Sequence, residues 1–274
     1  MYVSVAVMDT GIFRHMDFDT RIAGFADFVG RKKYLYDDNG HGTHVAGIIA
    51  GSGKGSNGKY RGIAPDTFLV SVKVLDKSGN GKIENVVEAA GWIIENKSAM
   101  NIRVVNISFG TRAKMENGPA IETGEDDYAL IMAVEKMWDS GIVVVAGAGN
   151  NGPGNASVTA PGISKKIITV GAFDDKNFFS GRGPTRECIV KPEVVVTGSN
   201  IIACNNHQGR YSSKSGTSMA APVVSGAVAR LIKNNPDITP KEVKIWMKSC
   251  CKKINVPSEK QGWGVLDIRK FVTG

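Results

Sequence analysis

Three polar side chains far apart in the sequence could together make a hydroxyl group nucleophilic. Ser218 lies in the stretch Gly216-Thr217-Ser218-Met219-Ala220-Ala221-Pro222, ahead of apolar residues at the i, i+3, i+4 spacing of a buried helix. This pattern predicts Ser218 at a helix N-terminus, with Pro222 in the first turn. Free N–H groups and the positive dipole end there can stabilise an oxyanion. On this stretch alone, a serine that merely caps a core helix fits equally well.

An acid and a base that could serve this hydroxyl lie near the start of the chain. Asp9 follows the apolar run 3–8, which is typical of a strand buried on both faces of a parallel sheet. Ligands bind outside the carboxyl ends of such strands, although Asp9 alone also fits a turn or a cap. His41 falls at the start of a helix of small apolar residues. His41 and His44 have an i, i+3 spacing that could suit a metal, but no third ligand is evident nearby. A serine hydroxyl becomes nucleophilic when a base takes its proton and an acid orients that base.

Three stretches, in the order Asp, His, Ser, resemble the catalytic motifs of the subtilisin-like serine proteases, the subtilase family. They are Asp9-Thr10-Gly11, His41-Gly42-Thr43-His44 and Gly216-Thr217-Ser218-Met219-Ala220-Ala221-Pro222. Other serine hydrolases arrange the same groups in other orders. The resemblance runs from Val3 to Asp267. It implies that Asp9, His41 and Ser218 are catalytic and that the chain is a serine endopeptidase, a hydrolase working through an acyl-enzyme.

The resemblance also implies roles for residues around the triad. Asn150, at the end of the strand 142–146, would supply its side-chain amide to an oxyanion hole, with the Ser218 N–H as second donor. A substrate strand would pair with the chain near residues 108–110 and face the edge 79–83. The pocket implies broad specificity with an apolar preference before the scissile bond. The implied substrate-binding residues are Ser108, Phe109, Gly110, Gly81, Ile83, Ala148, Gly149 and Thr159.

The remaining elements alternate as in a parallel α/β protein. The expected fold class is α/β, a three-layer doubly wound fold with a mostly parallel central sheet and helices on both faces. Residues 1–274 are expected to form one peptidase domain. Strands are expected at 68–75, 104–108, 142–146, 167–171 and, as the last core strand, 191–198; helices are expected at 83–96, 128–139 and 240–248.

Composition narrows the partners and the location. The 274 residues are 42% hydrophobic, and the net charge of +8 is dispersed without a nucleic-acid motif. No apolar run approaches eighteen residues, which excludes a membrane span. Polypeptide substrates, a propeptide or an inhibitor are the expected partners, and a monomer is expected. The spacing of the four cysteines fits neither a zinc site nor a dense set of disulfides.

The start of the chain departs from the secreted members of the family. The chain begins at the catalytic strand, without a convincing leader, so the N-terminus is expected to be truncated relative to the family or dispensable. The Asp-Asn-Gly-His-Gly-Thr-His stretch looks most like the cytoplasmic bacterial branch. A cytoplasmic location is therefore expected, the alternative being a secreted protein whose leader and propeptide are missing here.

No cofactor is expected for the chemistry, and no metal ligand is assigned. Asp17 could match the acid of the family's tight calcium site, but the N-terminal ligand is absent and residues 52–61 are rich in Gly, Ser and Lys. A structural calcium ion thus stays open. The acidic loop 112–127 could select basic or extended substrates, or be a solvated insertion.

Two other functions remain open at this stage. A non-catalytic relative could bind peptides in the same groove, and an esterase or amidase could use the same acyl-enzyme chemistry. If His41 is the base, activity should fall below pH of about 6–7, because an unperturbed histidine has a pKa near 6.5.

Overall fold

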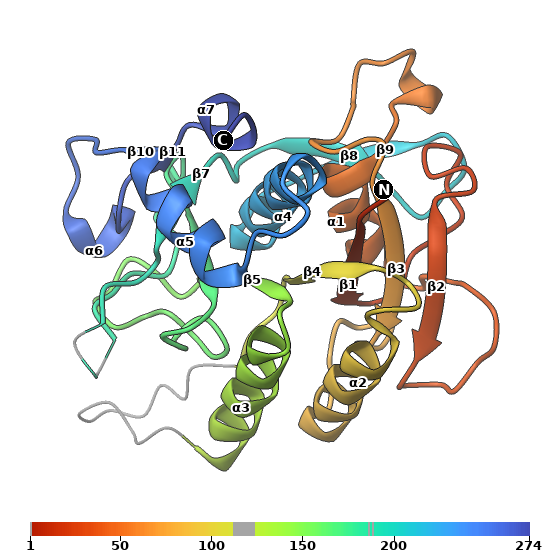
Figure 1. Ribbon diagram of the computed structural model, residues 1–274, viewed down its shortest axis with the longest axis horizontal. Coiled ribbons are helices and arrows are strands. Elements are labelled where there is room, and N and C mark those ends of the chain that lie inside the picture. Colours follow the sequence, from red (N-terminus) through yellow and green to blue (C-terminus); the bar gives the residue numbers. More distant parts are fainter. Residues whose placement is uncertain (1, 112–123, 186, 188) are drawn as a thin grey trace.

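In the computed structural model, which describes residues 2–111, 124–185, 187 and 189–274, a nine-stranded sheet forms the centre of the described part (Figure 1). Eight strands run parallel, and β10 pairs antiparallel with β11 at one edge. In spatial order the strands are β10 (Cys251–Lys252), β11 (Val265–Leu266), β7 (Val194–Val196), β6 (Ile168–Ala172), β5 (Val143–Gly147), β4 (Ile102–Ile107), β1 (Ser4–Asp9), β3 (Phe68–Lys73) and β2 (Ile22–Asp27). A separate hairpin pairs β8 (Ile201–Cys204) with β9 (Tyr211–Lys214).

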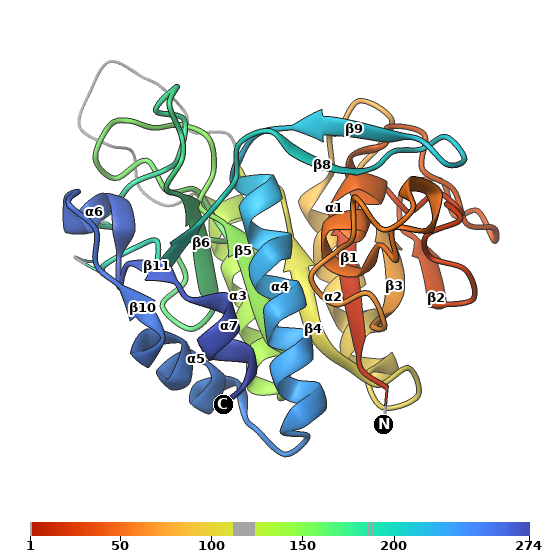
Figure 2. The same ribbon diagram turned by 90° about the horizontal axis from the view of Figure 1, so that it is seen from above.

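Helices cover both faces of this sheet (Figure 2). One layer contains α1 (His41–Ala50) and α4 (Thr217–Asn234), and the other contains α2 (Ile83–Asn96) and α3 (Glu125–Asp139). Alternate residues of β1 enter two separate hydrophobic cores: Val5 and Val7 face the first layer, and Ala6 and Met8 the second. The shorter helices are η1 (Lys54–Ser56), α5 (Pro240–Ser249), α6 (Ser258–Gln261) and α7 (Ile268–Val272). This arrangement is the three-layer α/β fold expected from the sequence.

The expected strands differ from the observed ones by one to three residues at their ends, and two elements differ in a more informative way. β7 is not the last strand of the sheet, because the two-residue strands β11 and β10 extend it, and segments so short carry no periodic pattern. α3 begins at Glu125 rather than Tyr128. Its first turn contains three acids, Glu125, Asp126 and Asp127, which the positive end of the helix dipole favours. The rest of the expected acidic loop, residues 112–123, lies outside the described residues.

The carboxyl ends of the central strands bring the candidate site together. β1 lies between β3 and β4, where the chain's strands diverge to either side, and such a point is where ligands bind in open α/β sheets. Asp9 is the last residue of β1, His41 is the first of α1, and Ser218 is the second of α4. The end of β1 and the starts of α1 and α4 therefore lie at one edge of the sheet.

Candidate active site

Asp9 and His41 form a close pair. The His41 Nδ1 atom lies 2.8 Å from Oδ1 and 2.9 Å from Oδ2 of Asp9. The Asp9 side chain is fully buried, whereas that of His41 is 25% exposed. Thr10 N also donates to Asp9 Oδ1, at 2.7 Å. Because Nδ1 faces a carboxylate, it carries the proton and leaves Nε2 free as a base.

The electrostatic surroundings of His41 favour its charged form. Burial lowers the pKa of His41, but the charge and hydrogen bond of Asp9 raise it, with a further contribution from Asp37. Lys214 on β9 opposes them, and the net effect is a pKa above the usual 6.5. Asp9 thus stabilises the imidazolium that would form when His41 accepts a proton.

A glycine allows the strand end and the helix start to approach. A Cβ atom at Gly42 would lie 2.1 Å from the Gly11 carbonyl oxygen and 3.1 Å from Asp9 Cβ. Gly11 itself has φ of 108°, and a Cβ there would lie 2.1 Å from the Tyr36 carbonyl oxygen. Side chains at these two positions would therefore push His41 away from Asp9.

Asp37 organises the loop before α1, a role that sequence analysis missed. Its Oδ1 atom accepts from Thr10 Oγ1 at 2.9 Å and from Gly40 N at 2.8 Å, and its Oδ2 atom accepts from Thr43 N at 2.9 Å. Thr10 Oγ1 in turn accepts from Gly42 N at 2.9 Å. Asp37 therefore connects the end of β1 to the start of α1. An acid just before a helix was the available signal.

Ser218 is bound to the end of β4. Its Oγ donates to the Ser108 carbonyl oxygen at 2.9 Å, and its own carbonyl oxygen accepts from Ser108 Oγ at 3.0 Å. The expectation that Pro222 lies in the first turn of the helix was wrong, because α4 begins at Thr217 and Pro222 is its sixth residue. Proline has no N–H to give to the carbonyl four residues earlier, so Ser218 O is free to accept from Ser108.

The third contact of a triad is not formed in this structure. Among the hydrogen bonds of the described residues, none joins Ser218 Oγ to His41 Nε2, since the hydroxyl donates to Ser108 instead. The structure therefore brings Asp9 and His41 together and places Ser218 at the same edge of the sheet. Rotation of the serine hydroxyl would have to complete the arrangement.

Ser218 lines a cleft of about 410 Å³. The cleft is also lined by six residues to which the resemblance gives a role at the substrate or the oxyanion: Asn150, Ser108, Phe109, Gly110, Gly149 and Thr159. Thr159 lies between two glycines, because a Cβ at Gly110 or Gly149 would come within 2.5 Å or 2.7 Å of Thr159 Oγ1. The threonine therefore fills part of the pocket and limits the size of the side chain that can enter.

Three expected substrate-binding residues do not line this cleft. Ala148 is fully buried, so it has no surface to offer. Gly81 precedes α2 and Ile83 begins it, in a segment on the other side of β1, because α2 follows β3. The additional lining residues that sequence analysis did not name as substrate-binding are Thr111, Gly147, Asn151 and Thr217.

The Asn150 side chain is oriented by α4. Its Oδ1 atom accepts from Thr217 N at 3.0 Å and from Thr217 Oγ1 at 3.2 Å. Because the carboxamide oxygen is engaged, its Nδ2 group remains as a donor beside Ser218. This is the arrangement that an oxyanion donor requires.

The described residues hold one cluster with metal-ligand chemistry, and it lies outside the cleft: His15, Asp17 and Cys204. Asp17 already accepts from Gly53 N at 3.0 Å, and Tyr211 OH lies 2.9 Å from its Oδ1. The Nδ1 atom of His15 accepts from Asp17 N at 3.2 Å. These donors occupy the lone pairs that a metal would need, so the cluster does not fit a metal site.

Comparisons with known proteins agree with the motifs. The model of the subtilase family matches residues 2–264. The serine protease AprX of Bacillus subtilis (strain 168) is 42% identical over 274 residues, which is 90% of this chain and 60% of AprX. The minor extracellular protease Epr of the same strain is 30% identical over 273 residues, 99% of this chain and 38% of Epr. The chain thus spans less than two thirds of both relatives.

The fold is also similar to that of solved structures. A cold-adapted subtilisin-like serine proteinase matches with a TM-score of 0.76 and 30% identity, over 96% of this chain and 86% of the other. The resemblance and the fold class expected from the sequence are confirmed. On this evidence the chain belongs to the subtilase family.

Proposed function

We propose that this chain is a serine endopeptidase. The observation that carries the proposal is the contact of both Asp9 carboxylate oxygens with His41 Nδ1, at the sheet edge where Ser218 lines a cleft. A buried acid that orients a histidine whose other nitrogen is free is the arrangement that activates a hydroxyl. The relatives AprX and Epr are both named proteases, which also supports the proposal.

In the proposed reaction, Ser218 Oγ leaves Ser108 O and attacks a peptide carbonyl carbon while neutral His41 Nε2 takes its proton. Asn150 Nδ2 and Ser218 N donate to the oxygen that becomes negative. The C–N bond then breaks, and the imidazolium protonates the leaving amine. Water then attacks the acyl-enzyme ester while His41 Nε2 takes its proton, and the imidazolium gives that proton to Ser218 Oγ as the ester C–O bond breaks.

The substrates proposed here are polypeptides. An extended peptide would pair with the chain after β4, at Ser108 to Gly110, and place one side chain in the cleft. Main-chain pairing tolerates many sequences, whereas the cleft supplies preference. Thr159 between Gly110 and Gly149 favours medium-sized apolar side chains over large ones. Control by a propeptide or an inhibitor and a monomeric state also remain proposals.

The location proposed here is outside the cell. Epr is named an extracellular protease, and secretion of this chain is consistent with that relationship. The expected cytoplasmic location has no support from the relatives. In the described part of the chain, no helix has the length and apolar character that crossing a bilayer requires.

The test is hydrolysis of an unfolded protein and of a chromogenic ester by the wild type, Ser218→Ala and Asn150→Ala. We expect Ser218→Ala to fold and lose both activities. Asn150→Ala should lower kcat by about 10²–10³-fold, as removal of one oxyanion donor typically does. Ester hydrolysis without proteolysis by the wild type would favour an esterase. Peptide binding with neither activity would favour a binding protein.

A further inference from the structure

Lys73 is a buried lysine at the edge of the candidate site. It is the last residue of β3 and the parallel-register partner of Asp9, the last residue of β1. Its side chain is 1% exposed. The proposed reaction makes no use of it. Burying an ammonium group is costly unless acceptors replace its water, so its surroundings indicate what the group holds in place.

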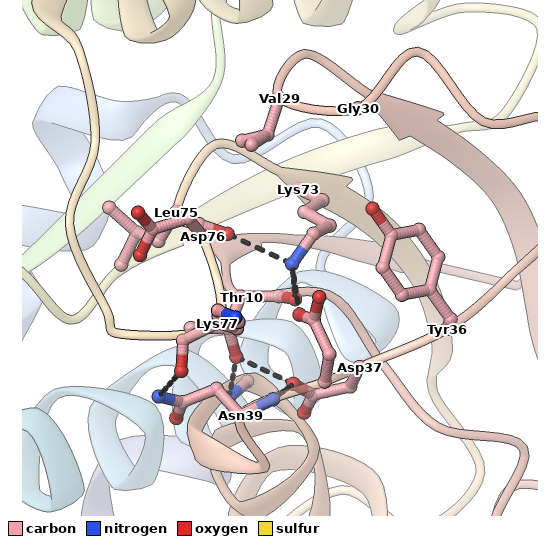
Figure 3. Close-up of polar contacts among 12 residues, drawn as sticks. Thr10, Val29, Gly30, Tyr36, Asp37, Asn39, Lys73, Leu75, Asp76 and Lys77 are labelled. Atoms are coloured by element: carbon pink, nitrogen blue, oxygen red, sulfur yellow. Dashed lines mark hydrogen bonds and ion pairs between the residues drawn. The ribbon is translucent and has the colours of Figure 1, made fainter.

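Three oxygen atoms accept hydrogen bonds from the Lys73 ammonium group. Figure 3 shows this group near Thr10, Leu75 and Tyr36. Nζ donates to the Thr10 carbonyl oxygen at 2.6 Å, to Asp38 Oδ1 at 2.7 Å and to the Leu75 carbonyl oxygen at 3.0 Å. The Tyr36 ring centroid lies 4.8 Å from Nζ. An ammonium group has three protons, so each can be given to one of these acceptors.

These contacts fix the backbone on both sides of the Asp9 peptide. Val74 N and Leu75 N both donate to the Asp9 carbonyl oxygen, at 2.9 and 3.2 Å. Lys73 holds the next carbonyl along, that of Thr10. Residues at the end of β3 therefore donate hydrogen bonds to two consecutive carbonyl oxygens, those of Asp9 and Thr10. The direction in which the Asp9 side chain leaves the strand is therefore set largely by residues 73–75.

The same ammonium group reaches the loop that carries His41. Asp38 lies three residues before His41 and forms an ion pair with Lys73, whereas Asp76 interacts with Lys73 only through its charge. Its neighbour Asp37 accepts from Thr10 Oγ1, the side chain of the residue whose carbonyl Lys73 binds. Lys73 thus joins the strand that ends in Asp9 to the loop that leads into His41.

We propose that Lys73 is a positioning residue of this enzyme: its ammonium group holds the Asp9 end of β1 against the loop that leads into His41. The proposal rests on the proposed function. Lys73 touches no reacting atom. Its effect is to keep both Asp9 oxygens within hydrogen-bonding distance of His41 Nδ1, and small misplacements in such arrangements are costly, up to about a hundredfold in rate.

The charged groups around the pair define the expected signature. His41 is influenced by Asp9 on β1, by Asp37 before α1 and by Lys214 on β9. Removal of a nearby cation would, by charge alone, favour the imidazolium and raise the pKa of His41. Loss of the Asp9 contact would do the opposite, because Asp9 is the main group that raises this pKa. The direction of the shift therefore separates positioning from charge.

The main test is Lys73→Met, with Lys191→Met as a matched control. Lys191 is also fully buried and donates to Glu193, Thr169 and Ile167, but it lies before β7. We expect both variants to lose thermal stability. Only Lys73→Met should lower kcat, by about tenfold or more when the rate is divided by the concentration of active sites found by titration. Its KM should be unchanged, and the acid limb of its pH profile should move to lower pH. An unchanged kcat and profile, or a limb moved to higher pH, would overturn the proposal.

A second pair of variants tests the contact between Lys73 and Asp38 from the side of Asp38. This side chain is half-exposed, so the fold should tolerate its loss. Asp38→Asn keeps an oxygen for the Lys73 ammonium group, whereas Asp38→Ala removes it. We expect Asp38→Asn to keep kcat within about twofold and Asp38→Ala to lower it further, as loss of one charge-assisted hydrogen bond would. Equal kcat in the two variants would contradict the proposal.

Titration of the His41 imidazole by NMR gives a readout that does not need activity. The pKa of His41 is measured in the wild type and in Lys73→Met. A lower pKa in the variant supports the positioning role even if the chain cleaves no substrate tested. If instead the proposed function is wrong, the wild type will be inactive, while the pKa of His41 will still be lower in Lys73→Met than in the wild type.

Discussion

The double contact between Asp9 and His41 determines the pH range in which the base is neutral. Burial lowers the pKa of His41, Asp9 raises it, and the net pKa lies above 6.5. A base must be unprotonated to accept the Ser218 proton, so the acid limb of kcat/KM should lie above pH 6.5. The sequence alone predicted a fall below about pH 6–7, and the buried carboxylate moves this expectation upward.

Lys214 opposes that shift and offers a direct check. It lies on β9, four residues before Ser218, and its positive charge lowers the pKa of His41. Replacement by a neutral side chain should raise that pKa. We therefore predict that Lys214→Gln moves the acid limb of kcat/KM to higher pH. The same profile measured for Lys248→Gln, an exposed lysine on α5, should match the wild type. A limb that stays in place in both variants would contradict this assignment.

At the residue scale, the sequence located the chemical groups but not their supports. Asp9, His41, Ser218 and Asn150 lie in motifs, so a resemblance could assign them. The roles of Asp37 and Lys73 depend on hydrogen bonds between segments brought together only by folding. No local pattern predicts the contacts of Lys73, and for Asp37 the only local signal is an acid ahead of a helix. The Ser218 carbonyl oxygen has no partner within α4 because Pro222 lies four residues later. This could be known only once the start of α4 was located.

At the element scale, His44 joins α1 to the β8–β9 hairpin. Its Nε2 atom donates to the carbonyl oxygens of Ile201 at 3.1 Å and Ser212 at 2.9 Å. Its Nδ1 atom is buried and has no hydrogen-bond partner within the described residues. Burial lowers the pKa of His44 to about 4. The hairpin leads directly into Ser218, so this histidine connects the segment after His41 to the segment before the nucleophile.

The lowered pKa of His44 makes stability depend on pH. A group whose folded pKa lies below its unfolded value contributes stability above the unfolded pKa, near 6.5, and that contribution is lost as pH falls towards about 4. The full span corresponds to roughly 3 kcal/mol. His15 is shifted in the same direction, and His41 in the opposite one.

We predict that His44→Asn lowers the free energy of unfolding at pH 7 and flattens its decline between pH 6.5 and 4. The cause is that asparagine retains a donor for the hairpin carbonyls but does not titrate. Urea unfolding at several pH values measures both quantities. His207→Asn, an exposed histidine in the hairpin turn, is the control and should keep the wild-type slope. Equal slopes in wild type and His44→Asn would rule out His44 as the source.

Elements with a long apolar pattern could be predicted, and short ones could not. The helix expected at 83–96 is α2 with the same bounds, and the helix opened by Thr239 begins with the capping box that its sequence suggests. β10 and β11 have two residues each, too few for a period. β2 was not expected, because as an edge strand it is only partly buried.

At the scale of the whole molecule, Asp17 anchors the segment after α1. Its carboxylate accepts from Gly53 N at 3.0 Å and Gly55 N at 2.9 Å, and Tyr211 OH lies 2.9 Å from Oδ1. The resemblance to the family makes this acid a candidate calcium ligand. We propose instead that N–H and O–H donors fulfil the anchoring role, so that the loop is held without an ion.

We predict that a chelator leaves the melting temperature unchanged, because backbone amides rather than a cation neutralise Asp17. Asp17→Asn should lower it by several degrees, since the carboxamide cannot accept from all of these donors. Differential scanning calorimetry with EDTA and with added calcium measures both effects. Asp19→Asn, an exposed acid in the same loop, should behave as the wild type. A large fall in melting temperature with EDTA would show that an ion is bound.

The position of β1 in the sheet also has a consequence for biosynthesis. This strand is synthesised before its partners β3 and β4 and before the nucleophile on α4, with about two hundred residues between Asp9 and Ser218. A ribosome-bound fragment that ends before α4 lacks the serine altogether. Such a fragment therefore has no nucleophile for the proposed reaction while synthesis continues.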